Sequence, residues 1–335
     1  MRKTWILALV CAAGLSGQSL RQLAEARSVK IGAAVNPMRL NEPAYAETLA
    51  REFSQAEPEN AMKFGPIHPA RDRYNWAPAE AVANFAREHN MALRGHTLVW
   101  HQQLAPWVTA GAPSPADLEK ILGEHIAAVV GHFAGQVYAW DVVNEAIEKD
   151  GSPRKSPWSP VPDYIAKAFR MARAADPKAK LFYNDYDAEG IDAKSDAIYA
   201  LVKDLKQRGV PIDGVGMQFH ITAKPLDTES IAANMKRLTD LGLEVQITEL
   251  DVRVPLDSSG RPGAADLEAQ ARVYGQVART CLKFPRCTAI QTWGVTDKYS
   301  WVPGYFKGTG AALLFDREYN PKPAYEAMRA AFGAR

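Results

Sequence analysis

The chain has 335 residues, of which 47% are hydrophobic and 23% are charged. This composition is typical of a globular protein with one large core, and it excludes disorder of the chain as a whole. With 40 Lys and Arg residues against 38 Asp and Glu residues, the formal net charge is only +2. A balance so close to neutral argues against nucleic acid as a partner and suits an uncharged one.

Residues 1–19 have the layout of a secretory signal peptide. Two basic residues precede an apolar run over residues 5–15, and small and polar residues follow it. The run is too short to span a bilayer, which needs roughly 20 apolar residues. We therefore predict cleavage near Gly17 to Ser19. The mature protein is expected to be exported to the periplasm or the extracellular space, to stay off membranes and to act as a monomer.

Beyond residue 19, short apolar runs alternate with longer stretches of helical periodicity, and no linker or fixed-period repeat interrupts them. Eight runs predict strands, at residues 30–35, 53–57, 92–99, 137–143, 180–183, 214–219, 244–248 and 289–294. Six stretches predict helices, at residues 78–89, 116–133, 161–175, 193–208, 230–241 and 265–282. Alternating units of this kind, eight in number, predict an α/β protein with a single (β/α)8 TIM barrel. A doubly wound open sheet is the main alternative, but the first strand is not followed by a glycine-rich dinucleotide fingerprint.

Two of the three cysteines remain after removal of the signal segment, which contains Cys11. Cys281 and Cys287 flank a Pro-containing turn, and in an oxidising compartment this spacing predicts a local disulfide. So short a loop contributes little to stability. The alternative is a pair of free buried thiols.

Two glutamates close apolar runs that are predicted to be barrel strands. Glu145 follows residues 138–144, and Glu249 follows residues 244–248. Because the carboxyl ends of parallel strands meet at one mouth of a barrel, we expect the two carboxylates to face each other there. Two carboxylates about 5 to 5.5 Å apart are typical of the active site of a glycosidase that retains anomeric configuration. The sequence therefore predicts cleavage of a glycosidic bond.

A histidine relay is predicted beside Glu249. Residues two apart on a strand face the same way, so Gln218 shares a face with His220, and Glu249 shares one with Asp251. We expect His220 to hydrogen-bond Glu249 while Asp251 orients the imidazole. The predicted chemistry needs no cofactor or metal, and no His-Glu-x-x-His spacing occurs. The sequence leaves open whether a loop binds a structural calcium ion.

Six segments together resemble glycoside hydrolase family 10, whose main members are endo-1,4-β-xylanases. The segments are Glu59-Asn-Ala-Met-Lys63, Gly95-His-Thr-Leu-Val-Trp-His101, Asp141-Val-Val-Asn-Glu145, Asn184-Asp-Tyr186, Gly216-Met-Gln-Phe-His220 and Ile247-Thr-Glu-Leu-Asp251. They occur in family order, and the likeness covers nearly the whole mature chain. The resemblance implies one catalytic domain over residues 20–335 that acts on xylan and xylo-oligosaccharides.

The resemblance also implies a role for each motif residue. Glu249 would be the nucleophile and Glu145 the acid and base of a retaining double displacement, supported by His220 and Asp251. Asn144 would bond the 2-hydroxyl of the sugar at the reaction centre. The remaining substrate-binding positions would be Glu59, Asn60, Lys63, His96, Trp100 and Gln103 on the glycone side, Trp293 and Trp301 as aromatic walls, and Tyr186 and Gln218.

Two other functions are weighed against a xylanase. A β-1,4-glucanase on the same barrel is disfavoured because the bulk of Gln103 and Trp301 leaves little room for the hydroxymethyl arm of glucose. A non-catalytic xylan-binding protein is disfavoured because Glu145, Glu249 and His220 are all present. Three positions depart from the residues usual in the family and leave subsite preference open: Phe64 for Trp, Gln102 for Ser and Asp187 for Asn.

Overall fold

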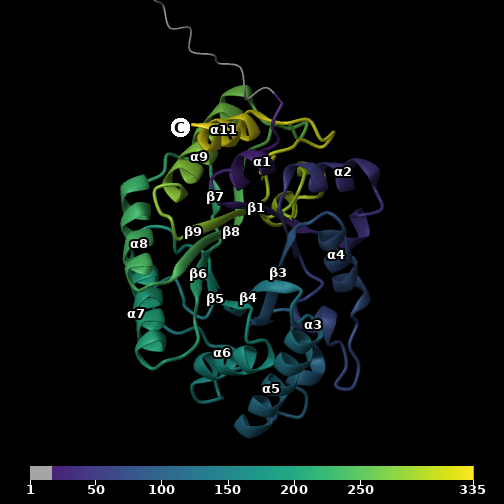
Figure 1. Ribbon diagram of the computed structural model, residues 1–335, viewed down its shortest axis with the longest axis vertical. Helices are drawn as coiled ribbons and strands as arrows, with labels where there is room; N and C mark the ends of the chain where they lie inside the picture. The colour runs from purple at the N-terminus through teal and green to yellow at the C-terminus, as the bar shows by residue number, and fades with distance from the viewer. Residues whose placement is uncertain (1–16, 335) are drawn as a thin grey trace, which may run out of the picture.

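The computed structural model describes residues 17–334, so residues 1–16 of the expected signal segment lie outside the described residues. Eight parallel strands pair in the order β1, β2, β3, β4, β5, β6, β8 and β9, and β9 pairs back with β1 to close a barrel. Helices surround this barrel on the outside (Figure 1). The predicted single (β/α)8 barrel is confirmed. The barrel strands are β1 (Lys30–Val35), β2 (Gln55–Pro58), β3 (Ala92–Val99), β4 (Val137–Asn144), β5 (Lys180–Asp185), β6 (Gly214–Met217), β8 (Glu244–Pro255) and β9 (Cys287–Thr292).

Each of the six predicted helices is present, with ends that differ by three residues or fewer. Five further helices complete the described α-helices. The α-helices are α1 (Leu20–Glu25), α2 (Pro43–Glu52), α3 (Phe64–Ile67), α4 (Ala77–Glu88), α5 (Pro115–His132), α6 (Tyr164–Ala175), α7 (Ala193–Gln207), α8 (Thr228–Asp240), α9 (Ala264–Cys281), α10 (Val302–Tyr305) and α11 (Pro323–Gly333). Three short 3-10 helices are η1 (Pro37–Arg39), η2 (Pro106–Val108) and η3 (Asp297–Tyr299).

Two predicted strands differ most from the observed ones, whereas the ends of the other six agree to within two residues. The run 214–219 is divided, because Phe219 has a φ of 61° and ends the extended backbone between β6 and a short strand, β7 (His220–Thr222). Strand β8 continues seven residues past the predicted end at residue 248. It does so because β7 pairs with it in parallel and β10 (Thr309–Gly310) pairs with it in antiparallel fashion.

The inside of the barrel is polar, although the strands read as apolar runs. Arg94 is fully buried there and forms ion pairs with Glu57 and Asp141. Its Nη1 also donates to Gln246 Oε1 at 2.5 Å, and the amide of Gln291 donates to Glu57 at 2.7 Å. The apolar core instead lies between the strands and the surrounding helices, as the buried face of α5 shows.

A disulfide joins the end of α9 to the start of β9. The Sγ atoms of Cys281 and Cys287 are 2.04 Å apart, so the predicted pair is confirmed and the alternative of free thiols is wrong. Within residues 17–334, the helices are too short or too polar for any of them to traverse a bilayer.

Candidate active site

A cleft of about 630 Å³ opens among the loops that follow the barrel strands. It contains every predicted catalytic and substrate-binding residue except Asp251, which is fully buried behind it. These lining residues are Glu59, Asn60, Lys63, His96, Trp100, Gln103, Asn144, Glu145, Tyr186, Gln218, His220, Glu249, Trp293 and Trp301. The two glutamates therefore face one cavity, as their positions on the strands predict.

Glu145 directly follows β4 and has a left-handed backbone, with a φ of 58°. A non-glycine residue in this region is uncommon and persists where neighbours hold it. Here the Glu145 N–H donates to Asn184 O at 2.9 Å, and Arg154 Nε donates to Glu145 O at 2.8 Å. The carboxylate accepts hydrogen bonds from Trp100 Nε1 at 2.8 Å and from Gln218 Nε2 at 3.0 Å. Backbone and side chain are thus both fixed in the cleft.

Glu249 lies within β8 rather than past its end, and it has the predicted relay. His220 Nε2 is 3.0 Å from Glu249 Oε2, and His220 Nδ1 is 2.9 Å from Asp251 Oδ2. Burial opposes a charge on the ring, but the two carboxylates outweigh it and raise the pKa of His220 to about 10. Burial likewise opposes charge on Glu249, yet the hydrogen bond from His220 leaves its pKa below the ordinary value. At neutral pH an imidazolium therefore lies between two carboxylates.

Two asparagines connect the glutamates. Asn144 Nδ2 donates to Glu145 Oε1 at 3.1 Å, and Asn184 Nδ2 donates both to Asn144 Oδ1 at 2.9 Å and to Glu249 Oε1 at 2.7 Å. A side chain at Gly216 would collide with Asn184 Oδ1, so glycine at this point of β6 keeps the bridge intact. The positions of the two carboxylates are coupled through this bridge.

Part of the cleft lining is built around Lys63. Its Nζ donates to Asn60 Oδ1 at 2.9 Å and lies 5.0 Å from the ring centroid of Trp100 and 5.6 Å from that of Trp293. Burial lowers the pKa of Lys63 and raises the pKa of Glu59. Desolvated donors and acceptors of this kind suit sugar hydroxyl groups, which replace the lost water.

The aromatic walls are fixed by polar contacts at their edges. Trp301 Nε1 donates to Asp251 Oδ2 at 2.8 Å, and its ring meets His220 edge-on at 5.0 Å. The ring of Trp293 lies edge-on to His96 at 5.2 Å. On another wall, Arg154 Nη2 donates to the hydroxyl of Tyr186 at 2.7 Å. Lys194 Nζ lies 3.5 Å from the ring centroid of Tyr186 and covers one face of that ring, and all three rings line the cleft.

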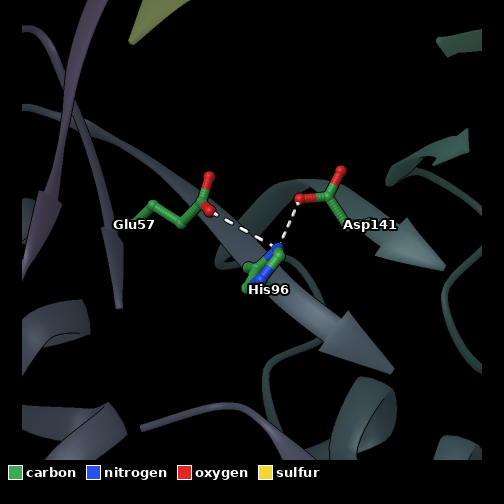
Figure 2. A group of neighbouring side chains, drawn as sticks. All are labelled: Glu57, His96 and Asp141. Atoms are coloured by element: carbon green, nitrogen blue, oxygen red, sulfur yellow. Dashed lines mark hydrogen bonds and ion pairs between the residues drawn. The ribbon is translucent and has the colours of Figure 1, made fainter. Parts of the chain in front are cut away.

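One group beneath the cleft has the residue types of a metal site. Glu57, His96 and Asp141 each offer a ligand atom within 4.8 Å of the others, and Figure 2 shows His96 between the two carboxylates. His96 Nδ1 is 3.0 Å from Asp141 Oδ2 and 3.7 Å from Glu57 Oε1. Arg94 forms ion pairs with both carboxylates and already supplies a cation. Burial and the neighbouring Asp141 raise the pKa of Glu57, so the set fits a buried ion-pair network better than a divalent metal.

Several residues in the cleft or buried behind it are not predicted as site residues from the sequence. Asn184 belongs to one of the six motifs, but strand-end position alone predicts no contact for its buried amide, which donates to Glu249. Arg154 lies in an irregular loop ten residues past the end of β4, so its position in the sequence does not predict that it lines the cleft. Arg253 lies beyond the predicted end of its strand, and only the observed length of β8 brings it to the cleft. Phe219, which separates Gln218 from His220 in the sequence, donates its N–H to Glu189 Oε1 at 3.0 Å. Burial raises the pKa of Glu189 to about 7.

A parallel barrel with two bridged carboxylates in a cleft at the strand ends defines the class of carboxylate-dependent glycoside hydrolases. The chain belongs to glycosyl hydrolase family 10, because the sequence profile of that family matches residues 19–331. It is 46% identical over 331 residues to endo-1,4-beta-xylanase B of Thermotoga neapolitana, a match covering 97% of this chain and 95% of the relative.

Solved structures agree with this assignment. Native xylanase 10B of Thermotoga maritima superimposes with a TM-score of 0.91 at 49% identity, over 94% of this chain and 98% of that one. Xylanase 10B of Thermotoga petrophila RKU-1 in complex with xylobiose superimposes with a TM-score of 0.92 at 48% identity, over 95% of this chain and 98% of that one. The family resemblance seen in the motifs is confirmed.

Proposed function

We propose that this chain is an exported endo-1,4-β-xylanase that cleaves internal bonds of xylan with retention of configuration. The observation that carries the proposal is the pairing of Glu145 with Glu249 in one cleft, each held by its own set of donors. The relatives named above support the substrate, because they are xylanases and one is bound to xylobiose.

In the first half of the reaction, Glu249 is the nucleophile. Its carboxylate oxygen bonds to the anomeric carbon as the glycosidic C–O bond breaks, and Glu145 gives its proton to the departing oxygen. Asn184 and His220 bond the two oxygens of Glu249 and hold the carboxylate in place. The result is a glycosyl-enzyme ester and a shortened chain.

In the second half, Glu145 acts as the base. It takes a proton from water, the water oxygen bonds to the anomeric carbon, and the ester bond to Glu249 breaks. Two inversions give net retention, and both carboxyl groups return to their starting states. The donors from Trp100 and Gln218 keep Glu145 aimed at the same point in both halves.

Substrate binding is assigned to the remaining cleft residues. Asn144, which touches Glu145, would bond the sugar 2-hydroxyl. Asn60 and Lys63 would bond hydroxyl groups of the glycone, with Glu59, His96, Trp100 and Gln103 beside them. Trp293 and Trp301 would wall the sugar at the cleavage point, and Tyr186 and Gln218 would contact the chain beyond it.

The substrate assignment is tested by product profiles on defined xylo-oligosaccharides and by relative rates on xylan and carboxymethylcellulose. We expect internal cleavage of xylotetraose and longer chains, and a far higher rate on xylan. A higher rate on carboxymethylcellulose would instead support the glucanase. Glu249→Ala should abolish turnover but retain oligosaccharide binding, whereas a wild-type protein that binds xylan and never cleaves it would support a binding protein.

Export by residues 1–19 and a monomeric mature chain are part of the proposal. We expect expression of the full chain to place activity outside the cytoplasm and expression of residues 20–335 to leave it inside. The same distribution of activity between cytoplasm and exterior for the full chain and for residues 20–335 would contradict the signal assignment.

A further inference from the structure

An arginine in the cleft wall has no carboxylate partner. Arg253 lies on β8, an even number of residues past Glu249, and lines the cleft. Its Nη1 donates to the carbonyls of His220 at 3.2 Å and Ile221 at 3.4 Å. No Asp or Glu within residues 17–334 forms an ion pair with it, and Nε and Nη2 have no partner in that part of the chain. Arg154, in the same cleft, differs because Glu148 Oε2 lies 3.1 Å from its Nη1.

The guanidinium of Arg253 lies over an aromatic cluster. Its central carbon is 3.9 Å from the ring centroid of Phe306. Phe306 in turn lies 4.8 Å from Tyr305 and 5.5 Å from Trp301, which is the proposed wall at the cleavage point. Tyr305 is 70% exposed, whereas most large apolar side chains of the described residues are buried. An exposed ring that continues the wall of a cleft is typical of a surface for a ligand.

The loop that carries these rings is tied to the strand that carries the arginine. Strand β10 begins three residues after Phe306 and pairs with β8 at the residues next to Arg253, with Gly310 opposite Val254 and Thr309 opposite Pro255. Trp301 is tied to the same strand through Asp251. Cation and rings are therefore held together as one rigid wall, with the fork of Arg253 directed by its two backbone contacts.

We infer that Arg253, Phe306 and Tyr305 form a subsite for a sugar that bears a carboxylate, namely a uronic acid branch on the xylan chain. The inference rests on the proposed function, because the branch must be carried by a chain in the cleft. A guanidinium with free Nε and Nη2 binds a carboxylate in two parallel hydrogen bonds. An aromatic face beside it stacks on the sugar ring. Glu145 and Glu249 in the same cleft would repel an acidic branch, and Arg253 places a positive charge beside it.

The test compares three xylo-oligosaccharides of equal length: unbranched, with one uronic acid branch, and with that branch as its neutral methyl ester. The measured quantity is the ratio of kcat/KM for the acid to kcat/KM for the ester, which cancels effects on the common chain. We expect a wild-type ratio of about 10 or more, because a hydrogen-bonded charge pair of this kind contributes a 10-fold to 100-fold effect. The ratio should fall with added salt.

Three variants test whether Arg253 is the cause of the preference for the acid over the ester. Arg253→Met should bring the ratio to about 1, and Arg253→Lys should leave an intermediate value because it keeps the charge and loses the fork. Arg261→Met removes an exposed arginine whose Nε bonds Ser259, and it should leave the ratio unchanged. A wild-type ratio of 1 or less, or a ratio that survives Arg253→Met, would overturn the subsite.

A binding measurement separates the subsite from the proposed activity. In the Glu249→Ala background, calorimetry should show tighter binding of the acid than of the ester, and Arg253→Met should remove the difference. If the wild type cleaves unbranched xylo-oligosaccharides and neither readout responds to Arg253, the subsite is wrong and the xylanase assignment stands. If no oligosaccharide is cleaved but the binding difference is present, the activity is wrong and the carboxylate subsite stands.

Discussion

Glu145 and Glu249 share one cleft, but different partners hold them. Glu249 contacts the protonated ring of His220 and the amide of Asn184, and a charged donor stabilises an anion more than a neutral one does. Within residues 17–334, the hydrogen bonds to the Glu145 carboxylate come from neutral indole and amide donors, and His101 Nδ1 lies 3.9 Å away. Double displacement requires two carboxyl groups in different surroundings: Glu249, whose negative charge is stabilised by a charged donor, and Glu145, which has neutral donors.

Replacing Glu145 by Gln tests its assigned role at the level of single steps. The amide keeps the size of the side chain and cannot donate a proton to the leaving oxygen. We expect kcat on xylan to fall by about 10²-fold to 10⁴-fold. An aryl xylobioside with a dinitrophenol leaving group needs no proton, so its burst of released phenol should remain nearly as fast as in the wild type.

The matched control is Glu119→Gln on α5, which removes an exposed carboxylate paired with Lys167 at 2.6 Å. It should leave both substrates unaffected. Equal losses on xylan and on the activated xylobioside in Glu145→Gln would contradict the acid role.

His220 should make stability depend on alkaline pH. Its folded pKa, about 10, lies above the ordinary value of 6.5. The stabilising contribution is therefore present in full below pH 6.5 and is lost as pH rises through 10. The advantage of the wild type over His220→Gln in free energy of unfolding should shrink between these values, by at most about 5 kcal/mol. Urea unfolding of both proteins at about pH 6 and pH 10.5 measures it, and an unchanged difference would contradict the ion-pair relay.

The relay could be predicted from the sequence, while the amide bridge could not. Side-chain alternation along strands places Glu249 with Asp251, and the structure has both expected hydrogen bonds to His220. Asn184 gave no comparable signal, because its contact with Glu249 depends on the register between β5 and β6. Register is set by packing of the whole barrel and is not written in a single strand.

At the scale of elements, β8 shows where strand prediction ends. The apolar run predicts a strand to residue 248, but pairing with β7 and β10 extends it to Pro255. Both partners are too short to give a pattern of their own. The extension matters because it carries Asp251 and Arg253 into the site.

The buried ion pairs between β2, β3 and β4 predict a large cost for losing their cation. Arg94→Met leaves Glu57 and Asp141 buried without a positive charge, so we expect the free energy of unfolding to fall by about 3 to 5 kcal/mol. Arg71→Met is the control, since Arg71 pairs with Glu124 at 3.4 Å on the surface and should matter by less than about 1 kcal/mol. Equal effects of the two substitutions in urea unfolding would contradict the electrostatic role of Arg94.

Helix α5 carries a second titrating contact, with α3. His125 is fully buried, stacks on Phe64 at 3.8 Å and meets His68 with its Nδ1 atoms 3.3 Å apart. Burial lowers the pKa of His125 well below its usual range. A lowered folded pKa means that stability is full above pH 6.5 and is lost as pH falls below it, by up to about 1.4 kcal/mol per pH unit.

His125→Leu should flatten that acid dependence. The leucine fills a similar volume and cannot take up a proton. Urea unfolding between about pH 7 and pH 5 should show a shallower fall in the variant than in the wild type. A slope identical in both proteins would show that His125 does not set the acid limit.

For the molecule as a whole, the barrel could be predicted because eight apolar runs alternate with helical stretches. Its polar interior could not, since Arg94 and Glu57 look like isolated charges in apolar strands until closure of the barrel brings them together. The sequence patterns do not predict helices α1 and α11, although α1 contacts β1 and α11 contacts α9. They contact each other across almost the full length of the sequence, which no local pattern reveals.

In the proposed mechanism, retention at the anomeric carbon depends on Glu145 and Glu249 acting in two successive displacements within one cleft. The most direct measurement is proton NMR of the first product released from xylohexaose, recorded before mutarotation. We predict that the β anomer appears first and the α anomer grows only at the rate of mutarotation. An α anomer released first would mean that water attacks in a single displacement, and the assignment of Glu249 as nucleophile would be wrong.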